Sequence, residues 1–239
     1  MKTSQKTLLL ALSIFILTSF SSCFVKIDDP LPVYHEQEQY YYLKNFDQLN
    51  MGSAFVVNVY QGNSFRVQAI GDEQDLDDLD VYVRNGVLYA RYVGYSNRRY
   101  KMTINITMPS ISEVNFSGAS DTYIEGFSVR YCNVFLSGAS YLKIDSDIQN
   151  LNFHVTGASE LNMIGNGEKT IGEVSGASLV NNFSFIADEQ TLSVAGASKV
   201  RVSAFRFLRV TASGASNVRY RGNPTLEKST SGASIVERD

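Results

Sequence analysis

Histidine and cysteine, two residue types on which much catalytic and metal chemistry depends, are scarce in this chain of 239 residues. It holds two histidines, His35 and His154, and two cysteines, Cys23 and Cys132. A zinc site needs three or four such ligands brought together, and a folded region with one histidine does not supply them. The Gly-x-Ser-x-Gly motif of a nucleophilic serine does not occur in the sequence. We therefore expect no metal site, no cofactor and no catalytic residues.

Serine nevertheless recurs in a fixed pattern. The tripeptide Gly-Ala-Ser occurs seven times after residue 110, at intervals of 18 to 20 residues. A nucleophile needs one serine beside one base, whereas seven equivalent serines indicate a structural repeat. The glycine and serine of the successive copies are Gly118 and Ser120, Gly138 and Ser140, Gly157 and Ser159, Gly176 and Ser178, Gly196 and Ser198, Gly214 and Ser216, and Gly232 and Ser234.

Cys23 points to lipid attachment. Two lysines precede the apolar run at residues 8–17, which is too short to span a bilayer and is typical of a signal peptide. Ser21 and Ser22 come directly before Cys23, which resembles the lipobox of bacterial lipoproteins. The resemblance implies cleavage before Cys23 and acylation, and two acyl chains hold a protein on a membrane stably. The alternative is an ordinary secretory signal with an incidental cysteine. Cys132 then has no disulfide partner, and its place in a predicted strand favours a buried structural thiol.

Basic side chains gather late in the chain. No acidic residue lies between Glu189 and Glu227, although the net charge of the whole chain is −3 and gives no reason to expect nucleic-acid binding. One interpretation is that these charges keep strand edges soluble. The other is a surface that binds an anionic glycan, a lipid headgroup or an acidic partner. The residues concerned are Lys199, Arg201, Arg206, Arg209, Arg219 and Arg221.

Carboxylates cluster in one other stretch, residues 72–80, which hold six acidic side chains. The stretch lacks the glycine and the ligand spacing of a calcium-binding loop, so we predict a solvated acidic loop or short helix. The outward positions that follow each Gly-Ala-Ser mix signs and residue types. A polysaccharide-cleaving site would need carboxylates that converge there.

Four segments follow from these patterns. We predict a signal peptide at residues 1–22, a tether at 23–44, an N-terminal β region at 45–110 and the Gly-Ala-Ser repeat at 111–239, with 45–239 forming one continuous domain. Within 45–110, short strands are expected at 55–60, 65–70, 81–83, 87–92 and 102–108. The dipeptide Asn85-Gly86 between two of them is a strong signal for a hairpin turn.

The repeat itself predicts an all-β solenoid. Apolar residues alternate with period two on both sides of each Gly-Ala-Ser, which indicates a strand, a corner and a second strand. About seven coils of 18 to 20 residues would stack in parallel about 4.8 Å apart, in the right-handed sense. Glycine would permit a corner conformation barred to other residues. The serines either point inward as a hydrogen-bonded ladder or line a surface edge, and the parity of the corner decides between the two.

Five sequence pieces, in order, resemble the auto-transporter adhesin head GIN domain family, which is common in Bacteroidetes lipoproteins. They are Phe55-Val56-Val57-Asn58-Val59, Phe65-Arg66-Val67, Gly86-Val87-Leu88, residues 104–109 and Phe116-Ser117-Gly118-Ala119-Ser120. The resemblance covers residue 46 to about residue 234. It implies a right-handed parallel β-helix and an adhesin role, and it brings no catalytic or binding residues.

The favoured hypothesis is a non-catalytic, adhesin-like binding module of the cell envelope, exported and lipid-anchored at the periplasmic or surface face of the outer membrane. Its expected partners are the membrane, through the anchor, and an anionic glycan or an envelope or host surface protein. A second hypothesis is a structural solenoid that self-associates into homo-oligomers through its open ends. The third and weakest is a polysaccharide-active enzyme.

Overall fold

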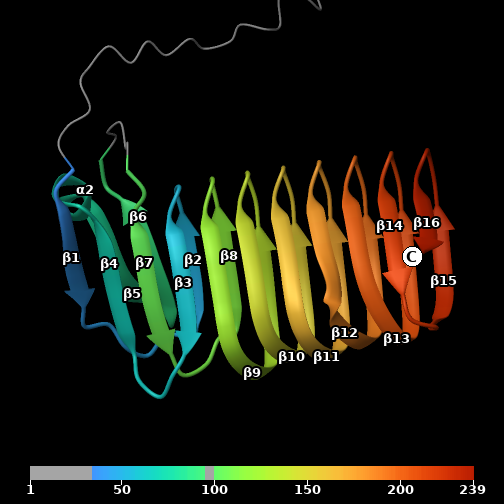
Figure 1. Ribbon diagram of the computed structural model, residues 1–239, viewed down its shortest axis with the longest axis horizontal. Coiled ribbons are helices and arrows are strands. Elements are labelled where there is room, and N and C mark those ends of the chain that lie inside the picture. Colours follow the sequence, from blue (N-terminus) through green and yellow to red (C-terminus); the bar gives the residue numbers. More distant parts are fainter. Residues whose placement is uncertain (1–33, 95–99) are drawn as a thin grey trace, which may run out of the picture. The chain divides into compact units, whose positions relative to one another are not determined.

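The computed structural model describes residues 34–94 and 100–239. The predicted signal peptide and Cys23 lie outside these residues. Residues 34–239 form one compact unit built almost entirely of β-strands (Figure 1). The fold is the predicted β-solenoid, with short N-terminal strands before the repeated coils.

Each coil of the repeat runs away from a Gly-Ala-Ser corner, bends, and returns to the next corner. The corners lie along the top of Figure 1 and the bends along the bottom. Successive strands pair in parallel, and paired residues are 17 to 20 positions apart in sequence, close to the spacing of the repeat. The long strands are β9 (Asp121–Leu136), β10 (Tyr141–Val155), β11 (Glu160–Val174), β12 (Leu179–Val194) and β13 (Lys199–Ala212), followed by the shorter β14 (Asn217–Arg221), β15 (Thr225–Thr230) and β16 (Ile235–Arg238).

The N-terminal strands extend both sheets of the solenoid. The strands β1 (Glu36–Tyr41), β4 (Arg66–Asp72), β7 (Thr103–Met108) and β3 (Val56–Gln61) lie side by side in that order and lead into the first half of β9. On the other side β5 (Leu79–Arg84), β6 (Val87–Tyr92), β2 (Gln48–Gly52) and β8 (Glu113–Ser117) lead into its second half.

Two local predictions in this region are confirmed, and one is wrong. Strands β5 and β6 form the predicted hairpin, and both Asn85 and Gly86 have positive φ, as a tight two-residue turn requires. The acidic stretch forms the short helix α2 (Glu73–Asp77), whose N-cap Asp72 accepts a hydrogen bond from the backbone N–H of Gln74. The tether predicted to reach residue 44 is too long, because β1 pairs antiparallel with β4.

The core consists of stacked columns of apolar side chains. The positions two before the first six corner glycines are buried, as are those four after all seven, such as Leu142 and Val180, whereas Thr230 in the last coil is exposed. One column is uneven, because Phe153 is fully buried directly beside Gly172 on the next strand. A Cβ atom on Gly172 would overlap the Phe153 ring, so the missing side chain of one coil makes room for the large ring of its neighbour.

Candidate functional site

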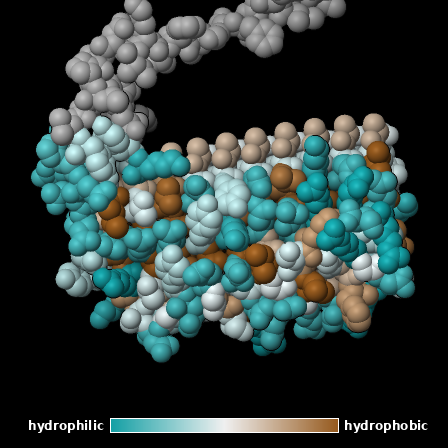
Figure 2. Space-filling view, in the orientation of Figure 1, coloured by the Kyte–Doolittle hydropathy of each residue, from teal (hydrophilic) through white to brown (hydrophobic). Residues whose placement is uncertain are grey.

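The Gly-Ala-Ser corners form a regular edge. Every corner glycine has φ between +70° and +79°, a region that residues with a Cβ rarely adopt. The alanine N–H of each coil donates to the glycine carbonyl of the preceding coil at 2.7–2.8 Å, as Ala158 does to Gly138. The alanines are exposed, and Figure 2 shows a row of small apolar residues along this edge. The motif therefore holds coils together.

The serines point inward. Ser140 and Ser178 are almost fully buried, and their hydroxyls donate to the carbonyls of Ser137 and Ser175 at 2.9 and 2.8 Å. Ser178 also lies 3.4 Å from the Gly157 carbonyl of the coil before. Five of the seven hydroxyls donate to backbone carbonyls, and those of Ser120 and Ser159 are buried without a hydrogen-bond partner. They face the core because the corner preserves the alternation of the strand. The serines of the first six corners are buried, and Ser234 of the last corner is partly exposed.

The six basic residues do not form one surface. Residues 199–203 of β13 pair with β14, whereas residues 207–212 of the same strand pair with β15 on the other sheet. Lys199, Arg201, Arg219 and Arg221 therefore lie on one sheet, Arg209 lies on the other, and Arg206 lies at the bend between them. Arg201 and Arg219 are register neighbours, as the repeat predicts.

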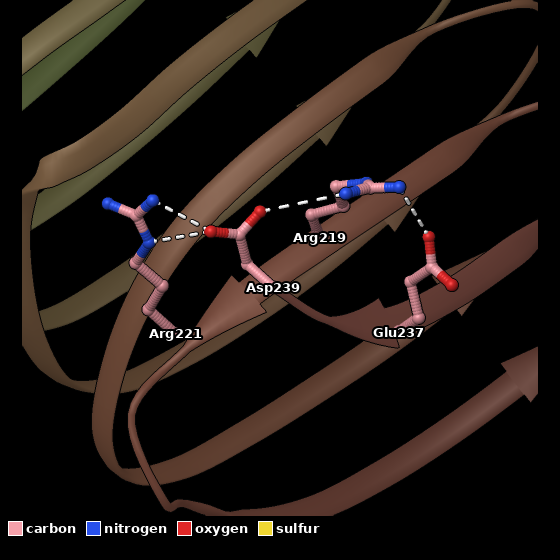
Figure 3. Close-up of polar contacts among 4 residues, drawn as sticks. All are labelled: Arg219, Arg221, Glu237 and Asp239. Carbon is pink, nitrogen blue, oxygen red and sulfur yellow. Dashed lines mark hydrogen bonds and ion pairs between the residues drawn. The ribbon is translucent and has the colours of Figure 1, made fainter.

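Four of these residues are also paired with carboxylates. Arg219 lies 2.9 Å from Glu237 and 3.7 Å from Asp239, and Arg221 lies 2.7 Å from Asp239 (Figure 3). The hydrogen bond from Arg221 lowers the pKa of Asp239. The Arg221 guanidinium also lies 3.9 Å from the centroid of the Phe183 ring.

Arg206 and Arg209 are likewise each paired with a carboxylate from a neighbouring coil. Arg206 lies 2.9 Å from Glu189, and Arg209 lies 2.8 Å from Glu227. These acids stand at the limits of the acid-free interval, about one coil away in sequence and adjacent in space. The predicted anion-binding surface is consequently wrong as a single patch. Of the six basic residues, Lys199 and Arg201 are the two without a carboxylate partner among the described residues.

Cys132 and His154 behave as structural side chains. Cys132 is 2% exposed, and burial raises the pKa of its thiol to about 12, so that it stays protonated and unreactive at neutral pH. His154 points outward as predicted, stacks on Phe135 and lies 3.1 Å from Glu173. Among residues 34–94 and 100–239, no group of three or more histidine, cysteine or acidic side chains is placed to hold a metal ion.

An aromatic cluster was missed by the sequence reasoning. Tyr60 of β3, Tyr123 of β9 and Tyr141 of β10 lie on the outward face of three adjacent strands. Beside Tyr60 is a shallow depression of about 370 Å³, lined by Tyr60, Gln61, Glu125, Gly126 and Asp145. The alternation of each strand shows that these rings point outward. Their proximity depends on β3 pairing with β9 across 65 residues of sequence.

The fold and these surfaces define an all-β solenoid with a structural repeat and exposed polar and aromatic faces. The chain belongs to the family described as putative auto-transporter adhesin, head GIN domain, whose model matches residues 45–224. No curated protein matches it. In the described part of the chain, none of the helices is long and apolar enough to cross a membrane.

Solved structures share the fold. A protein from Bacteroides fragilis, described as a putative adhesin, is 20% identical with a TM-score of 0.78, over 87% of this chain and 97% of its own. A protein from Parabacteroides distasonis, described as a putative lipid binding protein, is 17% identical with a TM-score of 0.70, over 85% and 96%. A second P. distasonis protein, described as a putative adhesin, is 12% identical with a TM-score of 0.72, over 86% and 98%.

Proposed function

We propose that this protein is a non-catalytic, adhesin-like binding module, anchored by lipid at Cys23 and displayed at the surface of the cell envelope. The observation that carries the proposal is the solenoid itself. Backbone ladders and buried columns fix its shape, which leaves two outward sheet faces whose side chains are free to vary. Membership of the adhesin family and the likeness to structures described as adhesins support the same role.

The arrangement of the exposed carboxylates favours binding over hydrolysis. A glycosidase needs two carboxyl groups that flank the scissile bond. Glu125 and Asp145 line the same depression, but they are register neighbours on adjacent strands of one sheet face. Both therefore approach a bound ligand from the same side.

One contact weighs against the structural hypothesis of end-to-end stacking. Lys228 occupies an inward column in the last described coil, and its ammonium donates to the Val236 carbonyl at 3.2 Å. A charged side chain directed inward at a sheet edge disfavours pairing with a further strand. Stacking another apolar column on this coil would bury that charge.

The binding function can be tested with residues 24–239 on an array of polysaccharides and extracellular-matrix proteins. We expect saturable binding to at least one class and no release of reducing ends from any polysaccharide. Absence of binding across the array at a protein concentration of about 100 µM, where even weak affinities register, would contradict the adhesin role. Release of reducing ends would contradict the non-catalytic assignment.

The anchor has its own test. Replacing Cys23 by Ala should move the protein from the membrane fraction to the soluble fraction and abolish labelling by a radioactive fatty acid, because the thiol that carries lipid is gone. Cys132→Ala is the matched control, since it removes the other cysteine and should leave both the label and the membrane fraction unchanged. A fatty-acid label that persists on the Cys23→Ala protein would rule out this anchor.

A further inference from the structure

The geometry points to a specific ligand site: the outward face around Tyr60, Tyr123 and Tyr141 binds an uncharged polysaccharide chain. The inference rests on the proposed binding function and names its site and ligand class. Four observations carry it, which are the alignment of the rings, their exposure, the polar groups beside them and the local charge.

The three rings follow a diagonal across adjacent strands. Tyr123 pairs with Asn58, two residues before Tyr60 on β3, and Tyr141 pairs with Asp121, two residues before Tyr123 on β9. Each step therefore moves one strand sideways and two residues along. The rings of Tyr123 and Tyr141 lie 5.9 Å apart at their centroids. A linear ligand that crosses the strands obliquely would contact all three rings in turn.

Two of the three rings are exposed, and that of Tyr141 is half-buried. Tyr60 and Tyr123 are 43% and 41% exposed, although both are large side chains on a sheet face that otherwise carries mainly polar residues. Burial of the hydroxyl group, then the charge of Asp121 and a hydrogen bond with it, raise the pKa of Tyr123. Tyrosine offers a large amphipathic contact surface at a small cost in conformational entropy. Tyrosine is enriched at interaction surfaces, and three tyrosines gathered on one face favour such a site here.

Polar groups flank the rings in the pattern that a sugar requires. A sugar has apolar ring faces, which stack on aromatic side chains, and hydroxyl edges, which donate to and accept from polar groups. Glu125 and Asp145 offer carboxylate acceptors beside Tyr60. Beyond Tyr141, the Asn162 amide donates to Glu160 at 2.8 Å, which fixes both side chains. The depression beside Tyr60 is of a size that accommodates a small ligand, within the range of about 300–1,000 Å³.

Local charge selects among polysaccharides. Four carboxylates surround the diagonal, those of Asp121, Glu125, Asp145 and Glu160, against one ammonium, that of Lys143. Repulsion between like charges disfavours a sulfated or uronic-acid polymer at this face. The unpaired cations Lys199 and Arg201 lie three coils or more from β3, so they do not offset this charge. An uncharged chain bears none of this repulsion.

The test uses residues 24–239, which contain the whole compact unit, and affinity electrophoresis through gels that contain laminarin, mannan, galactomannan, heparin or chitosan. We expect retardation by at least one of the three neutral polymers. Tyr123→Ala and Tyr60→Ala should each weaken that binding by about tenfold or more, as loss of a central aromatic contact does. Tyr123→Phe keeps the ring and should retain most of the affinity.

Tyr131→Ala is the matched control. Tyr131 is 57% exposed on the same strand β9, but it lies in the half that belongs to the other sheet, so its loss should leave the affinity unchanged. Thermal unfolding of each variant establishes that the fold persists. An equal loss in Tyr131→Ala, or no loss in Tyr123→Ala and Tyr60→Ala, overturns the site.

The remaining outcomes separate a failure of this ligand site from a failure of the adhesin function. Retardation by heparin or chitosan, but by none of the neutral polymers, would contradict the proposal that the ligand is uncharged. Retardation by heparin would instead favour an anion-binding site at Lys199 and Arg201. Binding to matrix proteins alone overturns this inference but leaves the adhesin function intact. Absence of binding to every polysaccharide and every matrix protein overturns both.

Discussion

Replacing Gly157 by Ala should lower the free energy of unfolding by roughly 2–5 kcal/mol, whereas Gly86→Ala should lower it by only about 1–2 kcal/mol. The two glycines have nearly the same backbone conformation, with φ of +78° and +79°. Both variants therefore incur the same strain of a left-handed alanine. Their surroundings differ. A Cβ on Gly157 would come within 3.0 Å of the Gly138 carbonyl oxygen, while the nearest atom to a Cβ on Gly86 is an Asp47 oxygen at 3.8 Å.

The corner cannot relax to relieve that overlap. Ala158 donates to the same Gly138 carbonyl at 2.8 Å, so moving the coils apart weakens the ladder. Urea unfolding of both variants measures the difference between their losses of unfolding free energy. An unchanged slope of free energy against urea concentration shows that the compactness of the folded and unfolded states is the same in both variants. Equal losses in the two variants would mean that backbone strain alone explains the corner glycines.

The second large effect concerns Phe153 and Gly172. We expect Phe153→Val to cost about 2–4 kcal/mol, because it leaves a cavity in a fully buried position. Gly172→Val should cost about 1–3 kcal/mol, because the new side chain overlaps the Phe153 ring. The double variant should lose less unfolding free energy than the sum of the two single losses, by about 0.5–3 kcal/mol. The new valine at position 172 fills the cavity, and the smaller side chain at position 153 removes the overlap.

The same column supports this expectation. Its members in neighbouring coils are Val134, Leu192 and Val210, all buried, so a valine at both positions reproduces the ordinary packing. Urea unfolding of the wild type, the two single variants and the double variant completes the cycle. Strict additivity would show that the cavity and the overlap are independent, contrary to the packing described.

The repeat could be predicted from the sequence because each coil contacts only its neighbours. The buried apolar residues of successive coils therefore recur at nearly one spacing. Cross-strand partners such as Leu142 and Leu161 fall one coil apart, as predicted. The Asn85-Gly86 hairpin was equally local. The direction of the serines was not readable, because it depends on whether the corner preserves parity, and the backbone of the glycine decides that.

Contacts between faces and between distant strands could not be predicted. The pairing of Arg219 with Glu237 and Asp239 requires that coils separated by about 20 residues meet side by side. The bend within β13 separates Arg209 from Arg201, although they are only eight positions apart in sequence. The strand β1 was missed because residues 36–41 are too polar to show an apolar period, and its order comes from pairing with β4.

The tyrosine diagonal required the same non-local information. Tyr60 belongs to β3, which joins the solenoid next to β9 after the chain has formed five intervening strands. Period-two alternation places each tyrosine on an outward face but does not say which strands are adjacent. A site assembled from three strands is therefore invisible until their order is known.

The corners and the bends tolerate change unequally. Every corner keeps one geometry, whereas the strand register slips at the bends, as it does between Asn182 and Ile186 of β12. At that bend β12 has three residues more than β13, and the segments on either side of it still pair in parallel, whereas residues added at a corner would break its hydrogen-bond ladder. We therefore expect insertions and deletions in such a protein to be tolerated at the bends and not at the corners. The depression beside Tyr60 includes Gly126, which lies at a bend, so new ligand preferences can arise there while the architecture is inherited unchanged.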